Sequence, residues 1–169
     1  MDRVLKDYFD SFRQQKKLPP ELLGKVEGRL FEDMETLKRW RNWREGLVYQ
    51  DERLDVTLQG ALDECLVKDG SYIPLDYKTK GSSPKQEDAE KYYQNQLDCY
   101  CLLLEANQRP TCSLGYLIFY SPGKVEGNGV VQFQVDPIRL ETDPLRAKQT
   151  LEKAMKLLVG DIKNDNVTC

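Results

Sequence analysis

Residues 60–79 read GALDECLVKDGSYIPLDYKT and contain the most informative pattern of the chain. Its centre, Lys68-Asp69-Gly70-Ser71, is a strong hairpin signal, because Asp-Gly accommodates the positive φ angles of a two-residue turn. Upstream, apolar residues alternate with others over 54–67, which predicts a strand, and residues 72–79 form the predicted return strand. We therefore expect two antiparallel strands joined by a tight turn.

The turn fixes which residues of the two strands face each other. It places Lys68 opposite Ser71, and counting outward in the same register brings Asp63 directly opposite Asp76. A four-residue loop gives the same pairing. Directly opposed residues lie roughly 4.5–5.5 Å apart at Cβ, so the two carboxylates are expected to be neighbours.

Two neighbouring carboxylates repel each other unless a positive charge lies between them. A divalent cation with oxygen ligands suits this position, and strand alternation puts Lys78 on the same face as Asp76, where it can polarise a water molecule. The alternative is that Asp63 and Asp76 point to solvent and pair with lysines, which is the commoner situation for two Asp residues on adjacent strands.

Helical and strand patterns flank the hairpin on both sides. We expect helices over 2–17 (ended by Pro19-Pro20), 34–45, 86–107 and 143–159, and strands over 114–120 and 129–135. Residues 114–120 are almost wholly apolar, as in a strand that is covered on both faces. This order predicts an α/β protein with a mixed central sheet flanked by helices.

The composition is that of one globular domain, and we assign 1–169 to a single domain. Apolar residues make up 40% of the chain and charged residues 31%, which excludes a disordered chain. Neither a signal peptide nor an apolar run of roughly 18 residues is present, so a cytoplasmic protein is expected. The net charge of −3 does not by itself indicate nucleic-acid binding.

The chain contains no histidine. This excludes Ser-His-Asp and Cys-His catalysis and every His-ligated metal site. The five cysteines, at 65, 99, 101, 112 and 169, form no CxxC pair. They are therefore expected to be reduced thiols, most of them buried.

Three segments carry a resemblance to a known family: GALDE at 60–64, PLDYKT at 74–79 and QLDCY at 96–100. Together they resemble the RecB-like branch of the PD-(D/E)XK nuclease superfamily, to which CRISPR-associated RecB-like nucleases and helicase-linked exonucleases belong. The match is close over 55–120. It implies a restriction-endonuclease-like fold and hydrolysis of DNA phosphodiester bonds.

The resemblance also implies roles for individual residues. Asp63, Asp76 and the backbone carbonyl of Tyr77 would bind Mg²⁺ or Mn²⁺, and Lys78 would orient the attacking water for in-line attack. Many relatives supply a further ligand, often His, from an N-terminal helix. Here Asp2 could substitute for it, and Glu27 is another candidate.

Several polar residues are candidate DNA contacts. Gln96 and Tyr100 lie four residues apart on one helical face, and the resemblance implies that they reach toward the catalytic site or the bound strand. The alternative is a core glutamine beside a packing tyrosine. Lys80 and Lys85 flank the loop after the second hairpin strand, where they could meet phosphates. A cluster of arginines and tryptophans could form a basic surface on which the bases of a single strand stack. The alternative is a solvated helix face with the tryptophans packed in the core. The members of this cluster are Arg39, Trp40, Arg41, Trp43 and Arg44.

Several relatives also hold an iron–sulfur cluster through one upstream and three C-terminal cysteines. Only Cys169 lies in the corresponding region here, so a cluster is not expected in this chain. The abrupt start at a helix leaves open that an upstream segment is absent.

The leading hypothesis is a metal-dependent deoxyribonuclease that acts on DNA ends or single strands. The second is a catalytically inactive domain of the same fold that binds nucleic acid or a protein partner. The third is an α/β domain without a role in nucleic-acid binding. No membrane association is expected.

Overall fold

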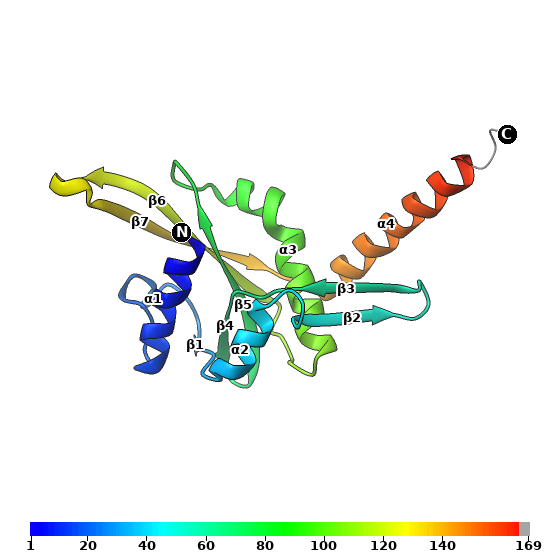
Figure 1. Ribbon diagram of the computed structural model, residues 1–169, viewed down its shortest axis with the longest axis horizontal. Helices are drawn as coiled ribbons and strands as arrows, with labels where there is room; N and C mark the ends of the chain where they lie inside the picture. Colours follow the sequence, from blue (N-terminus) through cyan, green and yellow to red (C-terminus); the bar gives the residue numbers. More distant parts are fainter. Residues whose placement is uncertain (166–169) are drawn as a thin grey trace.

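The computed structural model describes residues 1–165, with side chains described through residue 158. Five strands form a mixed sheet in the order β1-β4-β5-β6-β7, and β2 and β3 form a separate two-stranded sheet. In chain order the elements are α1 (Asp2–Gln14), η1 (Pro20–Leu22), β1 (Arg29–Leu30), α2 (Met34–Arg41), β2 (Leu47–Asp51), β3 (Val56–Gly60), β4 (Glu64–Lys68), β5 (Ser71–Thr79), α3 (Gln86–Ala106), β6 (Leu114–Val125), η2 (Gly127–Gly129), β7 (Val131–Glu141) and α4 (Pro144–Asp165). Helices flank the curled sheet (Figure 1). The predicted mixed sheet flanked by helices, consistent with a restriction-endonuclease-like fold, is confirmed.

The β4–β5 hairpin forms as predicted. Asp69 and Gly70 have φ angles of 49° and 80°, the left-handed conformation that a type I′ turn requires at both central positions. Lys68 faces Ser71, and the antiparallel ladder ends at the pair Glu64–Leu75. Asp63 and Asp76 therefore come immediately after the last ladder pair.

The prediction of one strand over 54–67 is wrong, because this segment forms two strands in different sheets. β3 pairs with β2, whereas β4 pairs with β5. Between them the chain crosses over the core: Leu62 is fully buried, and its amide donates to the Trp40 carbonyl at 2.9 Å. A side chain at Gly60 would begin 2.7 Å from the Leu103 side chain. Asp63 consequently lies in the connection just ahead of β4.

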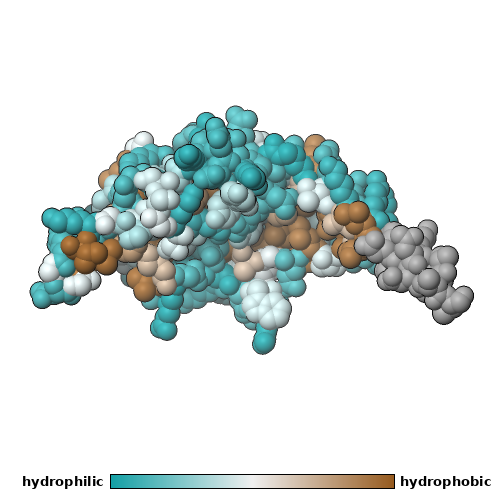
Figure 2. All heavy atoms as spheres, turned by 90° about the horizontal axis from the view of Figure 1, so that it is seen from above, coloured by the Kyte–Doolittle hydropathy of each residue, from teal (hydrophilic) through white to brown (hydrophobic). Residues whose placement is uncertain are grey.

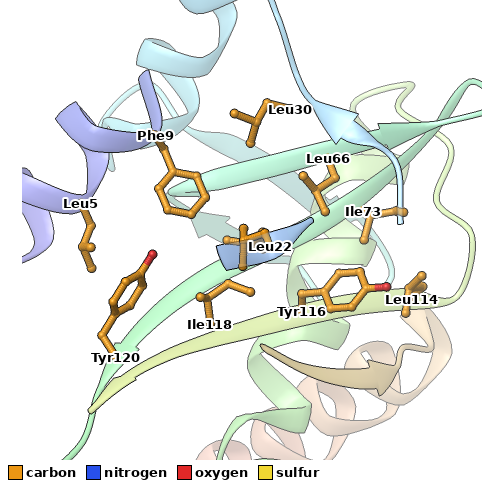
Figure 3. Close-up of a cluster of buried hydrophobic side chains, with 11 residues drawn as sticks. Leu5, Phe9, Leu22, Leu30, Leu66, Ile73, Leu114, Tyr116, Ile118 and Tyr120 are labelled. Carbon is orange, nitrogen blue, oxygen red and sulfur yellow. The ribbon is translucent and has the colours of Figure 1, made fainter. Parts of the chain in front are cut away.

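Side chains of β6 alternate between two buried faces of the sheet. On one face, α1 and η1 cover a core of Leu5, Phe9, Leu22, Leu30, Leu66, Ile73, Leu75, Leu114, Tyr116, Ile118 and Tyr120 (Figure 3). On the other, α3 packs Ala89 and Leu97 against Leu117 and Phe119. This confirms the prediction of a strand covered on both faces, and it places α1 and α3 on opposite sides of β5.

Several boundaries differ from the predictions. α1 ends at Gln14 rather than residue 17, and the chain turns at Lys16, whose φ is 55°. α2 ends at Arg41 rather than at residue 45. β6 and β7 run on as a long hairpin that projects from the sheet (Figure 1). Apolar side chains gather at that end of the molecule (Figure 2).

Two strands of the structure were not predicted from the sequence. They are β1, which has two residues, and β2. Within the described residues, no helix is both long and apolar enough to cross a membrane.

Candidate active site

Asp76 and Lys78 lie on the face of β5 that α3 covers. Successive side chains of a strand point to opposite faces. Ile73 and Leu75 join the core under α1, so Asp76 and Lys78 point to the other side. Asp76 is buried, with 3% of its surface exposed. Gln96 and Tyr100, on α3, face these two residues.

Gln96 links the two charged residues directly. The Lys78 ammonium donates to the Gln96 amide oxygen at 3.0 Å, and the Gln96 amide nitrogen donates to Asp76 Oδ1 at 3.3 Å. The same nitrogen lies 2.8 Å from the Tyr100 hydroxyl. The Lys78 ammonium also sits 4.8 Å from the ring centroid of Tyr93. Gln96 therefore contacts Asp76, Lys78 and Tyr100.

The second carboxylate oxygen of Asp76 has no hydrogen-bond partner although it is buried. The Lys78 ammonium lies 2.5 Å from it, as an ion pair without hydrogen-bond geometry. Burial raises the pKa of Asp76, attraction by Lys78 opposes this shift, and the charges of Asp63 and Asp2 add to it. A buried carboxylate oxygen that makes no hydrogen bond, in the field of a second carboxylate, is a suitable ligand for a hard divalent cation. These oxygen ligands therefore fit a divalent cation.

Asp63 contacts a lysine that the sequence did not suggest. Lys6 on α1 places its ammonium 2.8 Å from Asp63 Oδ1 and 2.9 Å from Asp2 Oδ2. Asp2 thus lies close to the site, bound to Lys6. Among the side chains that the structure describes, through residue 158, no group of three or more His, Cys, Asp or Glu is arranged to hold a metal ion. The Lys6–Asp2 spacing of four residues on a helix was visible in the sequence, but the contact to Asp63 was not.

A buried ion network lies behind the site, on the α1 face of the sheet. Its members are Asp10, Arg13, Arg41, Glu64 and Tyr77. Glu64 is fully buried and accepts from Arg13 at 2.5 Å and from the Tyr77 hydroxyl at 2.9 Å. Arg41 donates to both oxygens of Asp10, at 2.7 and 2.9 Å. The sequence did not predict this network, because its members come from four separate elements and no regular sequence spacing connects those elements.

The other predicted DNA contacts lie just beyond the C-terminal end of β5, close in sequence to Lys78. Lys80 follows β5 and pairs with Asp88 at 2.9 Å, and Lys85 is exposed at the N-terminal end of α3. Lys80 lines an apolar groove together with Tyr120, Pro122 and Phe133.

Three expectations about other residues need correction. Trp40 is buried and stacks on Phe31, and Arg41 belongs to the buried ion network, so neither can join a basic stacking surface. Trp43, 67% exposed, carries Arg44 over its ring, and Arg39 is exposed as well. Glu27 pairs with Lys68, at the opposite end of β4 from Asp63, and cannot be a ligand of the same ion.

The cysteines only partly follow their prediction. Cys65 and Cys101 are buried, but Cys99 is half-buried and Cys112 is exposed, and these four are free thiols. Cys169 lies outside the described residues.

The fold and the site together define a class: a mixed α/β sheet that presents Asp-x-Lys on one strand and a second Asp at the start of its neighbour. A profile of the PD-(D/E)XK nuclease superfamily matches residues 1–168. This chain belongs to that superfamily. Comparison with curated proteins gave no match.

Proposed function

We propose that this chain is a deoxyribonuclease that uses Mg²⁺ or Mn²⁺ and cleaves DNA at ends or in single strands. Membership of the nuclease superfamily supports hydrolysis of nucleic acid. The observation that carries the proposal is the buried carboxylate of Asp76, whose Oδ2 makes no hydrogen bond and forms an ion pair with the Lys78 ammonium. Burying a charged oxygen costs free energy, which the ion pair offsets in part and a bound cation would offset further.

The carboxylates of Asp63 and Asp76 and the Tyr77 carbonyl would hold the ion. When bound, such an ion stabilises the charge that develops on the phosphate oxygens. Lys78 would orient the water whose oxygen bonds to phosphorus while a phosphodiester P–O bond breaks. The products are a phosphate monoester and an alcohol. Gln96 would fix Lys78 for this role, because its amide oxygen accepts from the ammonium.

The proposed DNA contacts extend from this site along β5. Gln96 and Tyr100 would border the reacting strand, and Lys80 and Lys85 would contact phosphates. Phe133, 41% exposed beside Lys80, offers a ring on which an unpaired base can stack. The Gln96–Tyr100 pair also supports our assignment to the RecB-like branch, with CRISPR-associated relatives.

The test is degradation of end-labelled single- and double-stranded DNA in Mg²⁺, in Mn²⁺ and in excess chelator. We expect cleavage with either ion, none in chelator, and a loss of at least about 100-fold in Asp76→Ala and Lys78→Ala, as for removal of a group that stabilises the transition state. Lys91→Ala is the matched control, because Lys91 also lies over a tyrosine ring (5.1 Å from the Tyr92 centroid) but is exposed and makes no contact with Asp76. Cleavage that survives in both site variants would come from a contaminant and would contradict the proposal.

A second candidate function is a catalytically inactive module that binds DNA or a protein partner. The ion pair between Lys6 and Asp63 favours it, since an ammonium already neutralises one proposed ligand. DNA binding that is indifferent to Mn²⁺, without cleavage under any condition, would support this second function.

A further inference from the structure

We propose that Arg41 and the Tyr77 hydroxyl, joined through Glu64, are positioning residues that set the distance between the segment that carries Asp63 and strand β5. The inference rests on the proposed function, because it concerns the ligands of the same ion. Both residues belong to the buried ion network on the α1 face of the sheet, and neither side chain lies on the face that carries Asp76.

Arg41 holds the segment that carries Asp63. Its Nε donates to the Asp63 backbone carbonyl at 2.7 Å, and its two terminal nitrogens bind Asp10 on α1. The guanidinium is planar and its donors have a fixed geometry, so three hydrogen bonds determine where the Asp63 backbone lies relative to α1.

Glu64 and Tyr77 connect that segment to β5. Glu64 Oε2 accepts from the Tyr77 hydroxyl at 2.9 Å and from Arg13 at 2.5 Å, and it lies 3.4 Å from Arg41. Glu64 directly follows Asp63, and Tyr77 directly follows Asp76. Each member of this side-chain contact is therefore the chain neighbour of a proposed carboxylate ligand, on the opposite face of the sheet.

The position of the network explains why such a connection is needed. The β4–β5 ladder ends at Glu64–Leu75, so no ladder pair fixes Asp63 against Asp76. Asp63 and Asp76 carry like charges, and although each pairs with a lysine, their mutual repulsion opposes close approach of the two segments. Beyond the end of the backbone ladder, the hydrogen bonds from Arg41 to Asp63 and from Tyr77 to Glu64 hold the two segments together. Outer-shell residues of this kind typically change metal affinity or activity by about 10- to 100-fold.

The test measures the Mn²⁺ dissociation constant by calorimetry, together with the thermal midpoint, for Tyr77→Phe and Arg41→Lys. We expect both variants to bind Mn²⁺ about 10- to 100-fold more weakly than the unmodified protein. Tyr77→Phe removes only one hydroxyl and keeps the ring that packs 4.7 Å from Phe9. If Arg41→Lys does not fold, the Mn²⁺ affinity of Tyr77→Phe alone tests the positioning role.

Two matched controls separate positioning from general loss of stability. Tyr8→Phe removes another tyrosine hydroxyl that donates to a glutamate, Glu21, at 2.9 Å. Arg146→Lys alters another arginine that binds both oxygens of a buried aspartate, Asp98, and a backbone carbonyl. We expect Mn²⁺ binding within about twofold of the unmodified protein in both.

The outcomes distinguish this inference from the proposed function. If Asp76→Asn binds Mn²⁺ as well as the unmodified protein, the metal site itself is wrong, and the positioning role falls with it. If binding depends on Asp76 but Tyr77→Phe and a folded Arg41→Lys match the unmodified protein, only the positioning role is wrong. An equal loss in the two controls would also overturn it, because the effect would then follow stability alone.

Discussion

The Lys78 ammonium on β5 donates to the amide oxygen of Gln96 on α3 at 3.0 Å. This bond ties the proposed water-orienting group to a helix on the face of the sheet that carries Asp76. A lysine side chain has several rotatable bonds, so a fixed acceptor determines where its charge lies.

We therefore predict that Gln96→Ala lowers kcat by about 10- to 100-fold. The measurement is steady-state cleavage of a labelled oligonucleotide, with kcat and KM determined separately. Gln94→Ala is the control, because Gln94 lies on the same helix but donates to Asp98 and the Glu141 carbonyl instead. Equal kcat values in the two variants would remove Gln96 from the mechanism.

Lys80→Ala should weaken DNA binding at every sequence, because a phosphate contact carries no base information. Binding is measured in Ca²⁺ over a range of salt concentrations, and the slope of log K against log salt should fall in magnitude by about 0.7–0.9. Lys68→Ala is matched to it, since Lys68 also pairs with a carboxylate but lies at the hairpin turn, away from Asp63. An unchanged slope in Lys80→Ala would show that Lys80 does not contact phosphate.

The hairpin and its register followed from local sequence. Asp69-Gly70 permits one tight turn, and the turn then fixes every pair up to Glu64–Leu75. The Gln96–Asp76 contact was also within reach, because a polar amide in an apolar helical stripe requires a partner.

Long-range contacts account for what the sequence did not reveal. The break between β3 and β4 depends on Leu62 being buried under α2, and Lys6 reaches Asp63 across 57 positions of the chain (63 minus 6). Arg41 is one of two arginines on α2, the other being Arg39, and only the fold shows that Arg41 is the one that turns inward. No periodicity encodes such contacts, because they depend on how separate elements pack.

Asp10 makes the stability of the α1–α2 contact sensitive to acid. Burial raises the pKa of Asp10, but the hydrogen bonds and charge of Arg41 outweigh it, and the pKa lies below its usual value of 3.8. A lowered pKa in the folded state means that the stabilisation is complete above pH 4 or so and is lost as the pH falls through the folded-state pKa.

We therefore expect Asp10→Asn to reduce the free energy of unfolding by about 1–2 kcal/mol at pH 7. The difference from the unmodified protein should shrink as the pH falls through the folded-state pKa of Asp10. Urea titrations at several pH values measure it. A difference that stays constant from pH 7 to the lowest pH at which both proteins fold would show that the Asp10 charge does not stabilise the fold.

Phe9 anchors α1 on the sheet, fully buried against the Tyr77 ring. Phe9→Ala should reduce the free energy of unfolding by about 3–5 kcal/mol, because it leaves a cavity in the core. Val4→Ala on the same helix is the control. Val4 is 66% exposed, and the change should cost less than about 0.5 kcal/mol. Chemical denaturation measures the free energy of unfolding of both variants. Similar losses of this free energy in the two variants would contradict the packing of α1 described above.

A crystal structure grown with Mn²⁺ and measured at an anomalous wavelength of manganese tests whether Asp63 and Asp76 bind the same ion. We predict one anomalous peak in contact with the carboxylates of Asp63 and Asp76, with Lys6 displaced from the Asp63 oxygen that faces the ion. A structure with saturating Mn²⁺ in which both carboxylates keep their lysine partners and no peak lies between them would contradict it.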